Sequence, residues 1–425
     1  MLRILWYAKD APFLTSAYAK IADYLVLKRV SKHHKIALFC TVGYDIGCIE
    51  SKGEGVDVWY PRLVAANGED VLLQHMKDFN ADLFVSASDI WIYEQLPVWA
   101  KQGQIIWIPW CYIDYIPTER EADKLSPALM AVPTSKWLQE KLRAVGLENV
   151  ADPIFLGVDH EIFKPWIGDL DEEKKEITKG RLKASLGFPE DSFLIDMVQM
   201  NQTVRKPFEE QFHGIQIFKE QNPDVKVKVY CHSLPRQIPD GYSLPELALE
   251  YGMDYQKGDI RFADNYTMIC KGVLGYGEQV MAKIYNAADV VLDATTGVSP
   301  GMPVLESQSC GVPVIGTEYT CYPEFVHAGY CAKVGKYFRN PTMPWIKKAL
   351  PDPYSVADCL NRILNSKPEA WRNIGVQAMK PYSWDNCLKG WLDLLKEAEI
   401  MIDHKCLKIP TPSEALKTEA LILTQ

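Results

Sequence analysis

The stretch IYNAADVVLDATTGVSPGMPVLESQSCGVPVIG, from Ile284 to Gly316, contains a complete strand–helix–strand pattern. Its run ADVVLDA has the length and apolar content of a buried strand. A turn rich in Gly and Pro follows, and Pro303 can begin a helix because the first helical residue needs no N–H donor. A second Gly and Pro turn leads into the apolar run VPVIG. This order indicates one unit of a parallel sheet.

The same alternation of short apolar runs and amphipathic segments extends along the chain. It is typical of α/β domains with doubly wound parallel sheets. A charged segment, IGDLDEEKKEITKGRLKASLGFPEDS, divides the runs into two series. We therefore expect one domain in residues 1–168 and a second in 169–383, with a helix in 384–425 that packs back on the first. The runs are LRILWY, KIALFC, VDVWY, DLFVSA, QIIWIPW and ALMAVP in the first series, and FLIDMVQM, VKVKVYC, ADVVLDA and VPVIGT in the second.

The composition narrows the classes of function. The 425 residues suffice for two domains. No stretch approaches the roughly 18 uncharged apolar residues of a membrane span, and Lys9 and Asp10 break the first apolar run, so we expect a cytoplasmic protein without a transmembrane segment. The net charge of −9 disfavours nucleic acid as a partner. The 11 cysteines contain no CxxC pair, which disfavours a zinc site and a disulfide framework.

Glu306 lies one turn into the helix that Pro303 begins. The N–H groups at the start of a helix form a site for anions, and a carboxylate there could accept hydrogen bonds from both hydroxyls of a ribose. The alternative is that Glu306 only interacts favourably with the helix dipole. The residues of this segment alone leave both interpretations open.

Three motifs resemble those of the retaining glycosyltransferases of family 4, which have the GT-B fold of two facing Rossmann-like domains with a cleft between them. GVDHEIFKP (Gly157–Pro165) is similar to a motif at the end of that family's first domain. MNQTVRKPFEEQFHGIQIFKE, from Met200, is similar to the segment that opens the second. The segment from Ile284 matches the family's nucleotide-sugar signature at Tyr285, Asp289, Gly301, Pro303, Glu306, Cys310, Gly311, Pro313 and Val314.

The resemblance implies that a hexose is transferred from a nucleoside diphosphate sugar to an acceptor hydroxyl, with retention of the anomeric configuration. It further implies that Glu306 binds the donor ribose and that Lys206, with Arg205 beside it, binds the diphosphate. A compact ammonium near a helix N-terminus suits a diphosphate on its own chemistry. We therefore expect that no metal ion and no other cofactor is required. The donor sugar would contact a loop made of Ser299, Pro300, Gly301, Met302 and Pro303.

The sequence departs from the family pattern near the donor sugar. Val298 stands where the family has a glutamate, Pro300 where it has an aromatic residue, and Met200 where it has an arginine. Arg205 could supply the positive charge that Met200 lacks. Val298 and Pro300, together with the missing histidine described below, leave an alternative function open: a non-catalytic or weakly active protein that binds a nucleotide sugar.

The acceptor side also departs from the family. None of the eight histidines stands where the family has a histidine near the reacting sugar. Asp114 and Asp89 are the candidate catalytic residues in its place, and the alternative for each is an aspartate that caps a helix or turn. Aromatic residues around Asp114 could form a platform for the acceptor, and the alternative is that at least half of them belong to the core. They are Trp107, Trp110, Tyr112 and Tyr115.

The acceptor itself is open between a glycan, a lipid, a protein and a small molecule. The basic segment LKRVSKHHK, from Leu27 to Lys35, is interpreted as a solvated helix end. Its alternative is a surface for peripheral contact with a membrane.

Overall fold

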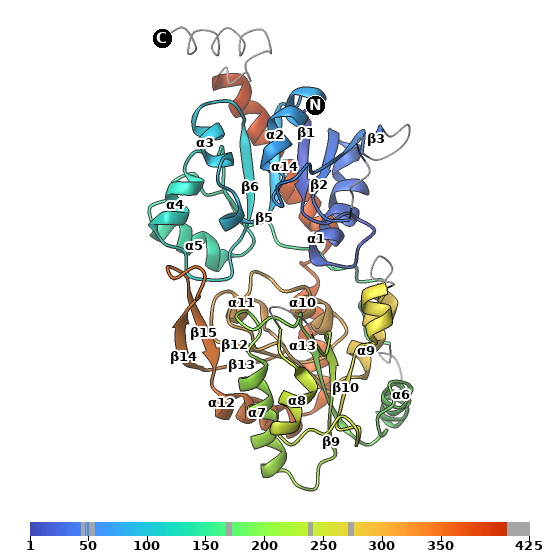
Figure 1. Cartoon of the computed structure of the whole chain (residues 1–425). Helices are drawn as coiled ribbons and strands as arrows, with labels where there is room; N and C mark the ends of the chain where they lie inside the picture. Colours follow the sequence, from blue (N-terminus) through green and yellow to red (C-terminus); the bar gives the residue numbers. More distant parts are fainter. Residues whose placement is uncertain are drawn as a thin grey trace. The chain divides into compact units, whose positions relative to one another are not determined.

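The computed structural model describes residues 1–43, 47, 49–50, 56–166, 172–236, 241–270 and 276–405. The chain divides into two compact units (Figure 1). Of the described residues, the first unit holds those within 1–113, 117–155 and 384–405, and the second holds those within 114–116 and 156–383. The boundary that the sequence suggested, between residues 168 and 169, lies outside the described residues. Residues 156–166 belong to the second unit, where Val158 forms a β-bridge with Ser383 and Phe163 packs on Tyr285.

The first unit is built on a sheet with the strand order β3-β4-β2-β1-β5-β6-β7. Its strands pair in parallel, except that β3 and β4 are antiparallel. The central strands are buried almost throughout, as expected for a parallel sheet that is covered on both faces. The strands are β1 (Arg3–Ala8), β2 (Lys35–Cys40), β3 (Ile49–Glu50), β4 (Val58–Pro61), β5 (Leu83–Asp89), β6 (Trp107–Tyr112) and β7 (Val132–Pro133).

The helices of the first unit include α14 (Trp384–Lys405), which comes from the far end of the chain. Trp391 of α14 packs edge-on against Trp6 and Trp110, with ring centroids 4.7 and 5.4 Å apart. This buried aromatic cluster attaches α14 to the sheet, while residues 406–425 lie outside the described residues. The other helices are α1 (Ala17–Lys20), η1 (Ile21–Leu27), η2 (Val30–Lys32), α2 (Glu69–Phe79), η3 (Ile90–Ile92), α3 (Leu96–Lys101), α4 (Glu119–Leu125) and α5 (Lys136–Ala144).

The second unit is built on a parallel sheet with the order β10-β9-β8-β11-β12-β13, and it also has an antiparallel pair, β14-β15. The chain runs from β8 to β9 and β10, then returns to β11 on the other side of β8. Ligands of open α/β sheets bind at such a switch point, beyond the carboxyl ends of the strands. The strands are β8 (Phe193–Val198), β9 (Val227–His232), β10 (Ile260–Phe262), β11 (Val290–Leu292), β12 (Val314–Thr317), β13 (Gly329–Ala332), β14 (Val334–Arg339) and β15 (Lys347–Pro351).

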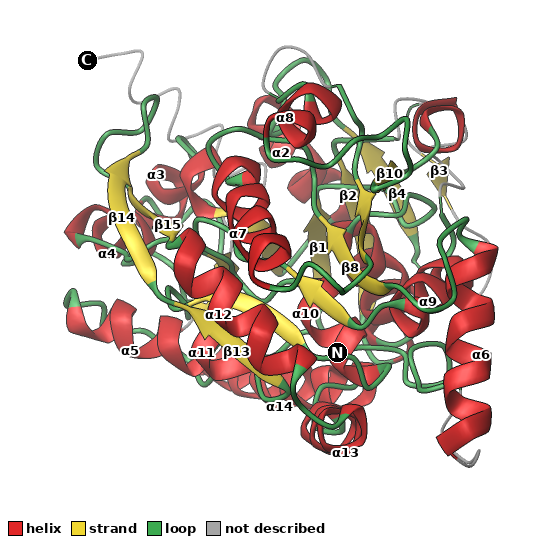
Figure 2. Ribbon diagram, turned by 90° about the horizontal axis from the view of Figure 1, so that it is seen from below, coloured by secondary structure: helices red, strands yellow, loops and turns green. Residues whose placement is uncertain are grey.

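Helices α7 (Phe208–Gln221) and α12 (Pro353–Leu364) pack together over the second sheet (Figure 2). Phe208, Phe212 and Leu360 are fully buried in their shared core. Gly214 allows the close approach, because a Cβ there would lie 2.6 Å from Val356 Cγ1. The other helices are α6 (Glu172–Ser185), α8 (Leu244–Glu250), η4 (Tyr266–Cys270), α9 (Glu278–Ala287), α10 (Met302–Ser309), α11 (Tyr322–Phe325) and α13 (Pro368–Met379).

The two sheets confirm the predicted α/β class, with parallel strands at the centre of each unit. Among the described helices, none has both the length and the apolar character needed to cross a bilayer.

Candidate functional site

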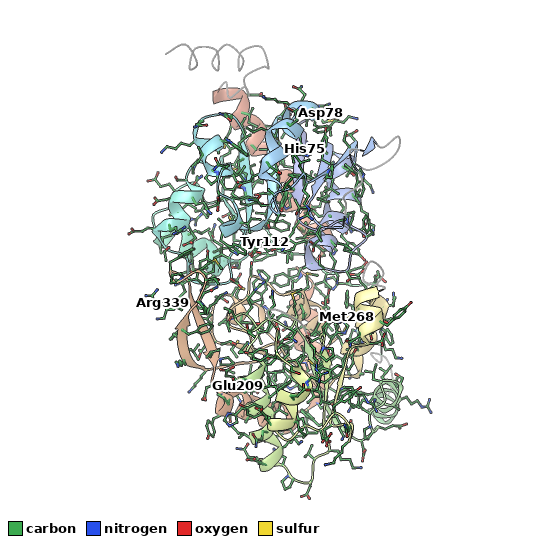
Figure 3. The ribbon with its side chains drawn as sticks, in the orientation of Figure 1. His75, Asp78, Tyr112, Glu209, Met268 and Arg339 are labelled. Carbon is green, nitrogen blue, oxygen red and sulfur yellow. The ribbon has the colours of Figure 1, made fainter. Side chains whose placement is uncertain are left out.

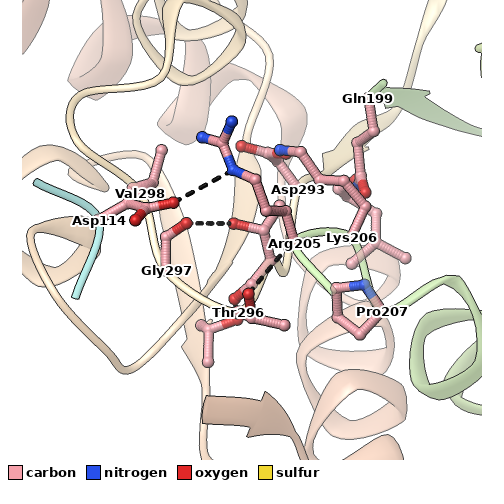
Figure 4. A network of polar contacts seen from close by, with 12 residues as sticks. Asp114, Gln199, Arg205, Lys206, Pro207, Asp293, Thr296, Gly297 and Val298 are labelled. Atoms are coloured by element: carbon pink, nitrogen blue, oxygen red, sulfur yellow. Dashed lines mark hydrogen bonds and ion pairs between the residues drawn. The ribbon is translucent and has the colours of Figure 1, made fainter. Parts of the chain in front are cut away.

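The candidate site lies at the switch point of the second unit, where Lys206 follows β8 and Asp293 follows β11 (Figure 4). Lys206 Nζ is 3.6 Å from Asp293 Oδ1, and the two side chains are 17% and 2% exposed. The Tyr322 hydroxyl, 3.0 Å from Asp293 Oδ2, can donate to it. Burial raises the pKa of Asp293 and lowers the pKa of Lys206. The attraction between the two charges opposes both shifts but is weaker than the effect of burial. An anion placed here would therefore meet a poorly hydrated ammonium, with which it interacts more strongly than in water.

A second ion-pair cluster joins Arg205, Asp114 and Lys348. Asp114 Oδ2 is 3.2 Å from Arg205 Nε, and Asp114 Oδ1 is 2.6 Å from Lys348 Nζ. Burial alone would raise the pKa of Asp114, but Lys348 and then Arg205 outweigh it and bring the pKa to about 2. A carboxylate of so low a pKa is a weak base at neutral pH. The ion pairs and the low pKa therefore favour an electrostatic role for Asp114 over a role as a general base.

Replacing Asp114 by Asn should reduce stability in a pH-dependent way. The folded pKa of about 2 lies below the ordinary 3.8, so the ionised carboxylate stabilises the fold above pH 4 and loses this effect as the pH falls through 2. The shift corresponds to about 2 kcal/mol at neutral pH. Denaturant unfolding from pH 7 to pH 2 should show the variant less stable at pH 7 and the difference narrowing below pH 4.

The matched control is Asp191→Asn. Asp191 pairs with Lys226 on the surface, where the side chains are 64% and 60% exposed, and exposed pairs contribute little. A constant difference between Asp114→Asn and the parent across this pH range would contradict the depressed pKa of Asp114.

The loop from Gly297 to Pro303 is fixed at its start by backbone contacts. Gly297 has a φ of 146°, and a Cβ there would lie 2.1 Å from the main-chain oxygen of Asp114, so only glycine fits. The next residue, Val298, donates its N–H to Thr320 Oγ1 over 3.0 Å. The loop therefore starts from a defined position beside Asp114 (Figure 4).

Asp293 places a carboxylate against the same loop. A Cβ at Gly301 would lie 3.1 Å from Val298 Cγ2 and 3.6 Å from Asp293 Oδ2. Both side chains therefore border the backbone of Gly301. The carboxylate of Asp293 therefore lies near Val298. Val298 stands where the family that the sequence resembles has a glutamate.

Glu306 is buried on α10, with 3% of its surface exposed. The hydroxyl of Tyr285, on α9, donates to its Oε2 over 3.1 Å. Tyr285 is itself fully buried, so this hydrogen bond helps to fix the orientation of the carboxylate. Such support is what the recognition of a ligand requires.

The start of α10 differs from the sequence prediction in two respects. The helix begins at Met302, so Pro303 is its second residue and Gly301 is the N-cap. The N–H of Val304 donates to the main-chain oxygen of Gly301 over 3.0 Å. That donor is already used within the helix, whereas the sequence indicated that the N–H groups at the start of this helix form a site for anions.

Asp89 ends β5 in the first unit, and Asp114 belongs to the second. Asp89 Oδ2 accepts a hydrogen bond from the Tyr18 hydroxyl over 3.3 Å.

The predicted aromatic platform is wrong, because its members are core residues with at most 8% of their surface exposed. Figure 3 marks Tyr112 among the side chains of the first unit. The four buried residues that were predicted to form the platform are Trp107, Trp110, Tyr112 and Tyr115.

Three residues of the site were not predicted from the sequence: Asp293, Lys348 and Tyr322. Asp293 could have been found, because it stands at the end of the strand ADVVLDA, where α/β proteins bind ligands. Lys348 had no local signal, since it is 234 positions away from Asp114. Tyr322 matched no motif.

Comparison with known proteins gives short sequence matches. No family model matches the chain. An O-antigen chain mannosyltransferase B from Escherichia coli is 31% identical over 121 residues, which are 27% of this chain and 27% of that protein. A ribonuclease Trv from Hypocrea rufa is 34% identical over 83 residues, 18% of this chain and 34% of that protein. The chain thus spans about a quarter to a third of the length of these relatives.

Comparison with solved structures covers nearly the whole chain. A sucrose-phosphate synthase from Thermosynechococcus elongatus has a TM-score of 0.65 at 14% identity, over 94% of this chain and 100% of that one. HepE from Anabaena, solved with UDP-glucose, has a TM-score of 0.64 at 12% identity, over 93% and 100%. The chain therefore has the GT-B fold that the sequence predicted, and at this identity the likeness extends to the fold alone.

Proposed function

We propose that the protein is a retaining glycosyltransferase that moves a hexose from a nucleoside diphosphate sugar to an acceptor hydroxyl. The observation that carries this proposal is the placement of Lys206 and Arg205 at the switch point of the second sheet. The fold and the local match to a mannosyltransferase support it. In this proposal Lys206 and Arg205 bind the diphosphate, Glu306 binds the ribose, and the sugar lies against the loop from Ser299 to Pro303.

The proposed mechanism is mainly electrostatic. When the bond between the anomeric carbon and the diphosphate oxygen breaks, its electron pair leaves with the diphosphate. Lys206, Arg205 and Lys348 would stabilise this developing charge, as fixed cations do in a dry site. The acceptor hydroxyl would attack from the same face and give its proton to the leaving phosphate oxygen, which retains the configuration.

Because Val298 replaces the family's glutamate, another residue would have to supply a carboxylate near the donor sugar. Asp293 is our candidate. Its Oδ2 borders Gly301 of the sugar loop, and its Oδ1 faces Lys206. A carboxylate there could accept a hydrogen bond from a sugar hydroxyl and keep Lys206 pointed at the phosphate. Asp89 stays a candidate for the acceptor side.

A donor titration tests the function. Calorimetric titration of UDP and GDP should reveal binding to one of them, and release of free sugar from the matching nucleotide sugar, without acceptor, should be slow but measurable. Binding of a nucleotide sugar with no turnover under any condition would instead support the non-catalytic binding protein, which Val298 at the loop favours. Failure of every nucleotide to bind would overturn both.

Donor binding should not depend on a divalent metal. The charge of the diphosphate would be met by Lys206 and Arg205, with Lys348 close by, so chelation leaves the main attraction in place. Titration of the preferred nucleotide with and without EDTA should give nearly the same affinity. A loss of more than about tenfold, or 1.4 kcal/mol, would contradict a metal-free site.

A further inference from the structure

A cavity of about 140 Å³ lies in the second unit, at the amino end of the sheet and not at the carboxyl end that holds the candidate site. Its walls include the first residue of β8, the residues just before β11 and β12, and the end of α10. The volume is roughly ten times the 10–15 Å³ that a single water needs. The charged side chains that line it are Lys179, Asp289 and Arg372.

Positive charge exceeds negative charge at this cavity. Asp289 Oδ1 is 2.9 Å from Lys179 Nζ, and Asp289 Oδ2 is 2.7 Å from Lys183 Nζ. The side chains are 20%, 21% and 8% exposed, respectively. One carboxylate therefore serves two largely buried ammonium groups, and Arg372 adds a third cation at the wall. Burial lowers the pKa of Lys179. The negative charge of Asp289 opposes this shift, and the positive charges of Lys183 and Arg372 add to it.

Arg372 is held by its stem rather than by its charged group. A Cβ at Gly311 would lie 2.6 Å from Arg372 Cγ, and Gly311 has a φ of 77°. The stem of Arg372 thus packs closely on a turn that requires glycine. In the part of the chain that the structure describes, the guanidinium of Arg372 makes no hydrogen bond and no ion pair. Its planar set of donors is available to a ligand.

We propose that this cavity binds a phosphate group, either as free phosphate or as the phosphomonoester of a small molecule. A guanidinium matches two oxygens of a phosphate at once, and an ammonium adds a point charge. The positive end of α13 favours the same ligand, since Ser366 and Pro368 at its start line the cavity. Lys179, Lys183 and Arg372 carry three positive charges, and Asp289 carries one negative charge. A phosphate dianion would balance the net charge of +2.

The cavity is independent of the proposed donor site. None of its lining residues belongs to the ion-pair clusters of Lys206 and Asp114, and the two sites lie at opposite ends of the strands. The inference therefore stands even if the proposed transferase activity does not.

The experiment is calorimetric titration of inorganic phosphate into the full chain at constant ionic strength, with sodium chloride as the blank. Arg372→Met, which keeps the length of the stem, should weaken binding at least tenfold, and Lys179→Met should weaken it comparably. Arg372→Lys keeps the charge but loses the paired donors, so its effect should be smaller. Arg181→Met is the matched control, because Arg181 is exposed on the same helix as Lys179 and does not line the cavity. Melting curves without phosphate check that each variant is folded.

Lys206→Met separates the two anion sites. Phosphate binding that persists in Lys206→Met and is lost in Arg372→Met belongs to the cavity, whereas a loss of binding in Lys206→Met with full binding in Arg372→Met would overturn the proposal. Absence of phosphate binding in the parent would overturn it as well. Glycerol phosphate forms the second arm: tighter binding than inorganic phosphate identifies a phosphomonoester as the ligand class, and weaker binding identifies free phosphate.

Discussion

Replacement of Lys206 by Met is expected to weaken the binding of a nucleoside diphosphate about 100-fold, the equivalent of about 3 kcal/mol. The ammonium of Lys206 lies at the end of β8, largely buried beside Asp293, where a charge interacts strongly with an anion. Met keeps the volume of the stem and removes the charge. Calorimetric titration of UDP and GDP into the parent and the variant measures the difference.

The fold should survive this change, because the pKa of Asp293 is already raised by burial. Without Lys206 that pKa rises further, and the neutral acid can still accept a hydrogen bond from Tyr322. Lys226→Met, in an exposed surface pair, is the control for the loss of a lysine. Full affinity in a folded Lys206→Met would refute the assignment of the diphosphate to this site.

Asp293→Asn, measured beside Lys206→Met, separates binding from turnover. The amide removes the negative charge that competes with a diphosphate for Lys206, so nucleotide affinity should be kept or increased. If Asp293 supports the donor sugar, sugar release should fall although the nucleotide still binds. Unchanged sugar release would remove Asp293 from the proposed mechanism.

The parallel sheets could be predicted from the sequence because buried strands read as apolar runs. LRILWY and KIALFC became β1 and β2, and FLIDMVQM and VPVIGT became β8 and β12. The antiparallel pair β14-β15 gave no such signal, because the residues of β14 are mostly exposed or half-buried. A strand without an apolar run lacks the pattern on which this kind of prediction depends.

The candidate site was predictable only in part. Glu306 and Lys206 could be named because residue type and position within a motif carry their chemistry. The pairing of Asp114 with Lys348 could not, since it joins residues that are far apart in the sequence and depends on the tertiary fold. The aromatic run around Trp110 was misinterpreted because β6 is an interior strand, with β5 and β7 on either side. All six residues of β6 are buried, so its side chains are covered on both faces of the sheet.

Replacement of Glu306 by Gln is expected to weaken nucleoside diphosphate binding about tenfold or more, since one charge-assisted hydrogen bond contributes roughly 1.5–3 kcal/mol. Glu306 stands on α10, with its carboxylate oriented by the Tyr285 hydroxyl. Gln keeps the shape but offers one neutral acceptor where two ribose hydroxyls would donate. Calorimetric titration of the preferred nucleotide gives the affinity, and the melting temperature reports on the fold.

The alternative role for Glu306, interaction with the helix dipole, predicts a different result: a change of about 0.3–1 kcal/mol in stability and none in affinity. Tyr285→Phe separates the two, because it leaves the carboxylate in place but removes the hydroxyl that donates to it. If Glu306 binds ribose, Tyr285→Phe should weaken nucleotide binding less than Glu306→Gln, since the acceptor is kept and only its orientation is loosened. Unchanged affinity in both variants, with a lowered melting temperature in Glu306→Gln, would assign Glu306 to the stability of α10 and leave the ribose without a partner on this helix.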